Sequence, residues 1–167
     1  AIDLTRAMKD LYREDWRNYR DASFVASVTD PTTNRTERRR FDLRTSREPI
    51  HISVAGRNSV IPGHPTSFFV ITSLADGTVI PCDVTVSESG PWRVSPDGTP
   101  ELTWRPLATA RTNRYGVARV RDVRLTGEVR ARRDVLELRI EAKARDGRTG
   151  SETEPFYVSD DALVIVE

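Results

Sequence analysis

Residues 136–145 read LELRIEAKAR, and this stretch decides the fold class of the chain. Its apolar residues occupy every second position: Leu136, Leu138, Ile140, Ala142 and Ala144. Charged residues occupy the positions between them. Successive side chains of a β-strand point to opposite faces, so this period of two predicts a strand with one face in a core and the other in solvent.

Upstream of this stretch, the chain repeats the same signature from Pro49 onward. Short apolar runs are separated by turn residues such as Asp76-Gly77, at intervals of about ten positions, which is typical of all-β domains. The near-continuous apolar run Thr66–Leu74 predicts a buried central strand. Val79–Ser87 predicts the next strand, with Cys82 on its inner face.

Two further segments are interpreted from their prolines. Residues 89–101 hold three prolines and two glycines, which predicts a long loop. A short edge strand is expected at Thr103–Leu107, because Pro106 cannot donate to a ladder. Downstream of residue 145, Pro155–Val158 is expected to begin the last strand.

These segments amount to about seven or eight strands with no crossover helix, so we predict an all-β fold. The specific prediction is an antiparallel immunoglobulin-like β-sandwich over residues 49–158. Its core is expected to contain Ile52, Phe69, Val84, Val120, Leu138 and Ile140.

The flanking segments are interpreted as parts of adjoining domains. Residues 1–48 contain a possible short helix within the first twenty positions and one β-hairpin, in which Phe24, Val28, Phe41 and Leu43 form an apolar face. A lone hairpin is marginal in water, so we expect residues 1–48 to be the end of a preceding domain. Residues 159–167 are expected to be a linker or the first strand of a following domain.

The composition excludes several classes of protein. The chain has 26 Lys and Arg against 25 Asp and Glu, and this net charge of +1 argues against a nucleic-acid-binding protein. Only Lys9 and Lys143 are lysines, so the basic charge is nearly all arginine, and surface ion pairs are the expected use. There is no apolar run long enough to span a membrane. A single cysteine, Cys82, excludes an internal disulfide.

No pattern predicts a catalytic centre, a cofactor site or a metal site. The two histidines, His51 and His64, have no second ligand at zinc spacing and are interpreted as solvated. Cys82 is interpreted as a buried, inert thiol rather than a reactive one. Aspartates at turns offer calcium as an alternative, although their side chains can satisfy local backbone donors instead. We therefore expect a protein that is not an enzyme.

Ordered turn motifs resemble those of a known family. Pro62-Gly63 precedes a long apolar strand, Asp76–Pro81 leads into the next strand, and Thr112–Ala118 forms a glycine turn after the proline-rich segment. In this order the motifs resemble macroglobulin domains of the alpha-2-macroglobulin-like family, of the bacterial type. The family's thioester motif is absent, because Cys82 is followed by Asp83-Val84-Thr85.

The resemblance implies a non-catalytic scaffold domain in an extracytoplasmic protein that traps and inhibits proteases. Its partners would be neighbouring domains of the same chain and, through the full-length protein, proteases. No nucleic acid and no membrane span is expected. The alternative is an immunoglobulin-like spacer or binding module of a surface adhesin or of a polysaccharide-acting protein.

Overall fold

The computed structural model describes residue 9 and residues 19–56, 59–61, 63–125 and 135–158. The described strands are β1 (Tyr19–Thr29), β2 (Thr36–Ser46), β3 (His51–Gly56), β4 (Ser59–Val60), β5 (Pro65–Ser73), β6 (Cys82–Val94), β7 (Pro100–Arg111), β8 (Val117–Arg124), β9 (Val135–Ala144) and β10 (Thr149–Val158). All pairings are antiparallel except the short β4–β10 pairing. The all-β prediction is therefore confirmed.

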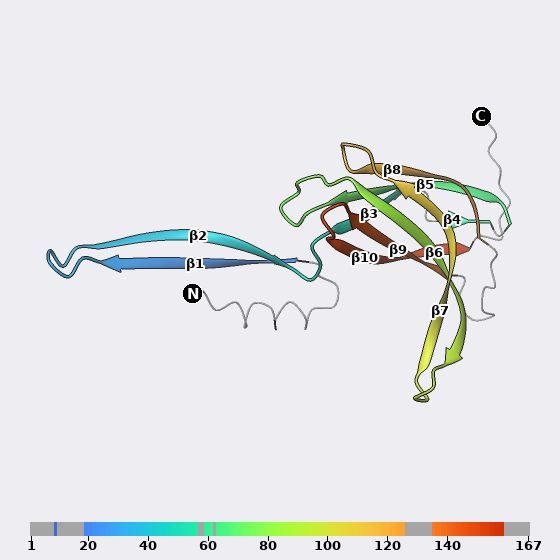
Figure 1. The fold of residues 1–167 in the computed structure, drawn as a ribbon, viewed down its shortest axis with the longest axis horizontal. Helices are drawn as coiled ribbons and strands as arrows, with labels where there is room; N and C mark the ends of the chain where they lie inside the picture. The colour runs from blue at the N-terminus through green and yellow to red at the C-terminus, as the bar shows by residue number, and fades with distance from the viewer. Residues whose placement is uncertain (1–8, 10–18, 57–58, 62, 126–134, 159–167) are drawn as a thin grey trace. The chain divides into compact units, whose positions relative to one another are not determined.

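The chain divides into two compact units, Ala1–Pro49 and Ile50–Glu167. In the first unit, β1 and β2 form a hairpin with eleven paired positions, from Tyr19 opposite Ser46 to Thr29 opposite Thr36 (Figure 1). The turn between them is held by Asp30, whose carboxylate accepts hydrogen bonds from the Thr32 amide at 2.8 Å and the Thr33 hydroxyl at 2.7 Å.

The second unit contains two sheets, antiparallel except for the β4–β10 pairing (Figure 1). Buried residues from both sheets form one core. The larger sheet has the order β4-β10-β9-β6-β7, and the smaller has the order β3-β5-β8. The ring of Phe68 on β5 meets that of Phe156 on β10 with centroids 5.5 Å apart, so this contact joins the two sheets. A two-layer core of this kind fits a β-sandwich.

Five of the six expected core residues are buried, and Phe69 is the exception. Phe69 is 44% exposed, whereas its neighbour Phe68 is 1% exposed. On β5 the inward positions are Phe68, Val70 and Thr72, and the register shift of the β5–β8 ladder between Thr66 and Phe68 places its extra residue on β8. A continuous apolar run gives no period, so the sequence could not choose between the two phases. The Phe69 ring instead lies under the guanidinium of Arg119, 5.9 Å from its centroid.

The loop expected at residues 89–101 is wrong. β6 and β7 form one long hairpin that closes at a turn around Asp97. The prolines do not break it because they sit at tolerated positions: Pro91 lies in a register shift, and Pro100 starts a strand. Thr103–Leu107 does belong to an edge strand, β7, but that strand is longer than expected.

Two boundaries also differ from expectation. The last strand begins at Thr149 rather than Pro155, because β10 pairs with β9 from Thr149 to Tyr157. β6 begins at Cys82, and Val79 makes only an isolated bridge to Ser73. The possible helix in the first twenty positions lies almost entirely outside the described residues, as do residues 159–167.

Candidate interaction surfaces

The residues considered for catalysis lie apart in the fold and form no common site. His51 is half-buried on β3 and His64 is exposed before β5. Cys82 is 2% exposed, and burial raises the pKa of its thiol. Among the described residues, no three His, Cys, Asp or Glu side chains are placed to hold a metal ion. Within the same residues, no helix is long and apolar enough to cross a membrane.

The aspartates at turns are used by their own turns. The carboxylate of Asp76 accepts the Thr78 amide at 2.8 Å, and that of Asp97 accepts the Thr99 amide at 3.1 Å. These bonds lower the pKa of Asp76, and the Ser95 hydroxyl has the largest lowering effect on the pKa of Asp97. Local backbone donors therefore account for both side chains without a metal.

The hairpin carries an apolar face. Its register places the following side chains on one side of the two-stranded ribbon: Ala22, Phe24, Ala26, Val28, Phe41 and Leu43. The rings of Phe24 and Phe41 lie directly across from each other and stack, with centroids 5.6 Å apart. Both rings are only half-buried, and Val28 is 71% exposed. The hairpin alone therefore leaves much of this apolar face exposed to solvent.

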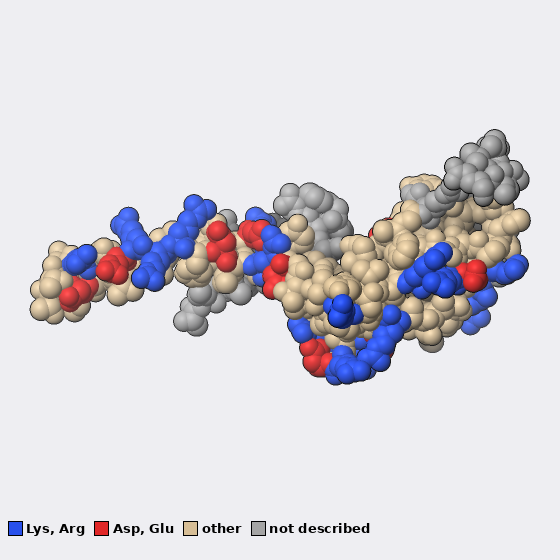
Figure 2. Space-filling view, turned by 90° about the horizontal axis from the view of Figure 1, so that it is seen from above, with Lys and Arg blue, Asp and Glu red and all other residues tan. Residues whose placement is uncertain are grey.

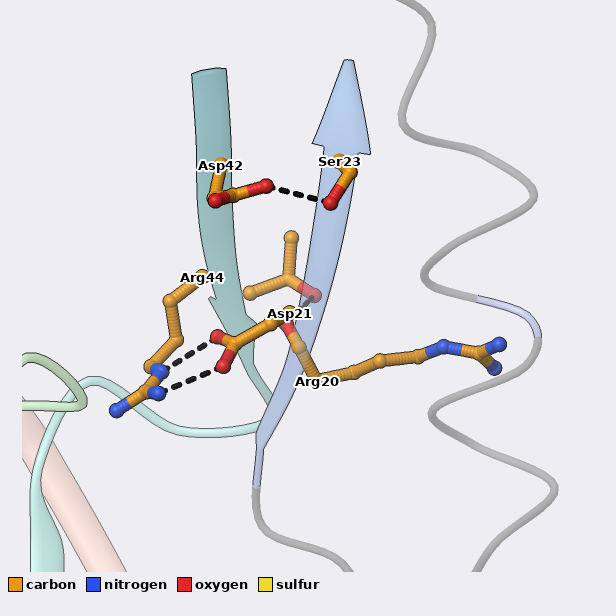
Figure 3. Close-up of polar contacts among 6 residues, drawn as sticks. Arg20, Asp21, Ser23, Asp42 and Arg44 are labelled. Atoms are coloured by element: carbon orange, nitrogen blue, oxygen red, sulfur yellow. Dashed lines mark hydrogen bonds and ion pairs between the residues drawn. The ribbon is translucent and has the colours of Figure 1, made fainter. Parts of the chain in front are cut away.

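The opposite face of the hairpin is polar and ion-paired. Figure 3 shows the guanidinium of Arg44 bound to both carboxylate oxygens of Asp21, at 2.6 and 2.7 Å. Further along, the Ser23 hydroxyl donates to Asp42 at 2.5 Å. The bonds from Arg44 lower the pKa of Asp21. These exposed pairs fix the register more than they add stability, since such pairs contribute about 0–1 kcal/mol each.

The side chains of Arg38–Arg40 alternate between the two faces of β2, because a strand has a period of two. Arg38 and Arg40 lie on the polar face, and Arg39 lies on the apolar face opposite Ala26. Arg40 donates to the Ser23 hydroxyl at 3.1 Å. On the side seen in Figure 2, basic and acidic residues of the hairpin are interspersed rather than gathered into one patch.

A groove of about 870 Å³ lies along the β6–β7 hairpin where the ladder is interrupted. We call it the β6–β7 groove. Glu88, 3% exposed, contributes a carboxylate that is bound by Arg105, with a distance of 2.7 Å from Nε. Trp104 lies under the guanidinium of Arg139, 4.7 Å from the ring. The Nε of Arg139 is buried and has no hydrogen-bond partner.

The sequence does not predict this groove, because the prolines and glycines of residues 89–101 indicate a loop. A signal was present in Gly90-Pro91, a pair that suits a bulge. A Cβ at Gly90 would lie 2.6 Å from the Thr103 hydroxyl, so the close approach of β7 needs glycine there. Bulges re-aim side chains and often lie beside binding sites.

Comparisons with known proteins give no family for this chain. No family model matches it, and no curated protein matches it. Among solved structures, it is similar to Spo0M, a sporulation control protein from Bacillus subtilis, at 11% sequence identity and a TM-score of 0.41. That similarity covers 68% of this chain and 50% of Spo0M, so the chain spans about half the length of that structure.

Proposed function

We propose that this chain is a non-catalytic scaffold module that holds neighbouring domains of one protein at a set geometry. In this proposal the sandwich is immunoglobulin-like and of the macroglobulin kind. The parent is an extracytoplasmic, protease-trapping protein of the alpha-2-macroglobulin type. The ordered turn motifs support the macroglobulin part, and the hairpin supports the scaffold part.

The apolar face of the hairpin is the observation that carries the scaffold role. Two strands alone form at best a marginal structure in water. The stacked pair Phe24 and Phe41 stays half-buried, and Val28 is largely exposed. An adjoining domain that packs on this face would order the ribbon and fix the direction in which the chain enters the sandwich.

Amide hydrogen exchange tests the scaffold role. The 167-residue chain is compared with the full-length product of the same gene. We expect β1 and β2 amides to exchange much faster than β9 amides in the shorter chain and to gain protection in the longer protein. Equal protection of the hairpin in both proteins would contradict the proposal.

Two neighbouring residues provide a matched pair of variants. Phe24 lies on the apolar face, and Val25 lies on the polar face and is 64% exposed. In the longer protein, Phe24→Ser should remove the added protection of the hairpin, whereas Val25→Ser should leave it. The protease-trapping part is tested separately, by protease inhibition assays on the full-length protein, which should inhibit where the module alone does not.

The β6–β7 groove favours a second candidate, the binding module of an adhesin or polysaccharide-acting protein. The ring of Trp104 lies in the lining of the groove beside the guanidinium of Arg139 and the Glu88–Arg105 pair, and an aromatic ring with polar neighbours suits a sugar ring. A glycan array with the chain tests this candidate. Binding that is lost in Trp104→Ala but kept in Trp92→Ala would support it, because Trp92 does not line the groove.

A further inference from the structure

Four arginines gather around one hollow of about 540 Å³ at an end of the larger sheet. Arg111 comes from the end of β7, and Arg114 comes from the turn before β8. Arg145 and Arg148 come from the turn between β9 and β10. We call this place the arginine hollow. Its arginines come from two separate connections, β7–β8 and β9–β10, so the charge lies around a concave space and does not form a flat stripe.

The positive charge of the hollow is only partly compensated. Asp146 is the only acidic residue in its lining, and both oxygens of its carboxylate are used by Arg148. Four arginines and one aspartate leave a formal excess of three positive charges in the lining. The whole chain has a net charge of only +1, so this excess is local. A concave surface of one sign concentrates ions of the opposite sign.

The contacts of the individual arginines leave this excess available. Arg114 donates to the Tyr115 hydroxyl at 2.6 Å and lies over that ring, so its partner is neutral. Arg111 is 3.7 Å from Asp83, and both side chains are more than half exposed. Within the described part of the chain, the Arg145 side chain makes no ion pair or hydrogen bond.

The backbone under the hollow is fixed. Thr112 is 2% exposed, and its hydroxyl accepts a hydrogen bond from the Cys82 amide at 2.7 Å. The Asn113 side chain accepts the Tyr115 amide at 2.8 Å and so closes the first turn. The Ala144 amide donates to the Arg148 carbonyl at 2.9 Å and closes the second turn. Little backbone conformational entropy is therefore lost when a ligand binds at these turns.

We propose that the arginine hollow binds a phosphate or sulfate group. A guanidinium binds oxyanions through paired N–H donors, and several guanidinium groups around one space suit a compact ion with more than one negative charge. A long polyanion would need a stripe of charge instead. The same group can come from the free ion or from the end of a larger molecule, and the probes below distinguish these sources.

The test is a titration of the full chain followed by two-dimensional NMR of its amides. Sodium phosphate, sodium sulfate and a sugar monophosphate are the probes, and sodium chloride at equal ionic strength is the control. We expect saturable shifts confined to residues 111–116 and 144–148. Equal affinity for inorganic phosphate and the sugar phosphate supports the free ion, and tighter binding of the sugar phosphate supports a group on a larger molecule.

A matched pair of variants decides the outcome. Arg145→Gln should weaken phosphate binding about tenfold or more, since it removes a hydrogen bond between charged groups and a tenfold change corresponds to about 1.4 kcal/mol. Arg121→Gln removes the same charge from an exposed position on β8, outside the lining, and should leave the affinity within about twofold. Equal loss in the two variants, or equal shifts with chloride, would overturn the proposal.

Discussion

At the scale of single residues, Thr72 links three chain segments through hydrogen bonds of its hydroxyl and its backbone. Thr72 is fully buried, and its hydroxyl donates to the Ile80 carbonyl at 2.6 Å. Its amide donates to the Gly116 carbonyl at 2.7 Å. A Cβ at Gly116 would lie 2.3 Å from the Thr72 carbonyl oxygen, and Gly116 has a φ of +70°. Glycine is therefore required at this position for two separate reasons.

We expect Gly116→Ala to lower the free energy of unfolding by about 2–4 kcal/mol, from left-handed backbone strain plus the clash. Gly147→Ala is the matched control, because Gly147 has a φ of +89° with nothing within 4 Å of an added Cβ. It should cost only about 1–2 kcal/mol. Urea unfolding measures both, and an equal cost would show that the Thr72 contact is unimportant.

A second residue-scale prediction concerns Cys82. Its thiol donates to the Ile80 carbonyl at 3.5 Å, and burial raises its pKa, so little reactive thiolate forms near neutral pH. A thiol reagent should label the native chain slowly and the urea-unfolded chain quickly. Thr109→Cys, at an exposed position of β7, provides a positive control. Labelling of native Cys82 as fast as that control would show a reactive thiol.

At the scale of elements, β10 is a sheet edge over much of its length, since β4 pairs only with Tyr157 and Val158. Glu152 and Glu154 on β10 lie opposite Ile140 and Leu138, so they share the inward face. Inward carboxylates at an edge discourage pairing with another chain. Desolvation, with a smaller effect from Glu152, raises the pKa of Glu154.

Glu154 should therefore cost stability at neutral pH. A carboxyl whose pKa is raised by folding binds its proton more tightly in the folded chain, so stability falls as pH rises through the unfolded and then the folded pKa. We expect Glu154→Gln to stabilise the chain at pH 7 and the gain to disappear below the ordinary pKa of glutamate. Thermal unfolding across this pH range measures it, with Glu137→Gln as an exposed control. A gain that does not depend on pH would contradict this account.

The elements also show where sequence reasoning succeeded. The strict alternation of Leu136–Ala144 predicted β9 and its inward residues correctly, because a period of two determines both the element and its face. The Thr66–Leu74 run predicted a strand but the wrong phenylalanine, because it has no period. The prolines of residues 89–101 predicted a loop, since bulges and edge positions that tolerate proline depend on neighbours distant in sequence. The arginine hollow was missed for the same reason, as its turns meet only in the fold.

At the scale of the whole molecule, the two compact units differ in how far buried apolar side chains stabilise them. The sandwich has a continuous core that includes Val84, Leu138 and Phe156 from three strands of one sheet. The apolar side chains of β1 and β2 are half-buried or exposed, and none of them is buried. Because core burial is the main stabilising term, the two units should differ strongly in their response to the same deletion of side-chain atoms.

Leucine-to-alanine substitutions in the two units test this difference. Leu138 is fully buried in β9, so Leu138→Ala should lower the free energy of unfolding of the sandwich by about 2–5 kcal/mol. Leu43 lies on the half-buried face of the hairpin, so Leu43→Ala should speed amide exchange in β1 and β2 and leave the sandwich unchanged. Fluorescence of Trp92 and Trp104, both in the second unit, follows the sandwich during urea unfolding in a Trp16→Phe background, because Trp16 belongs to the first unit. If Leu43→Ala lowered the sandwich midpoint as much as Leu138→Ala, the units would have to fold as one, and the hairpin would then draw its stability from the sandwich rather than from a neighbouring domain.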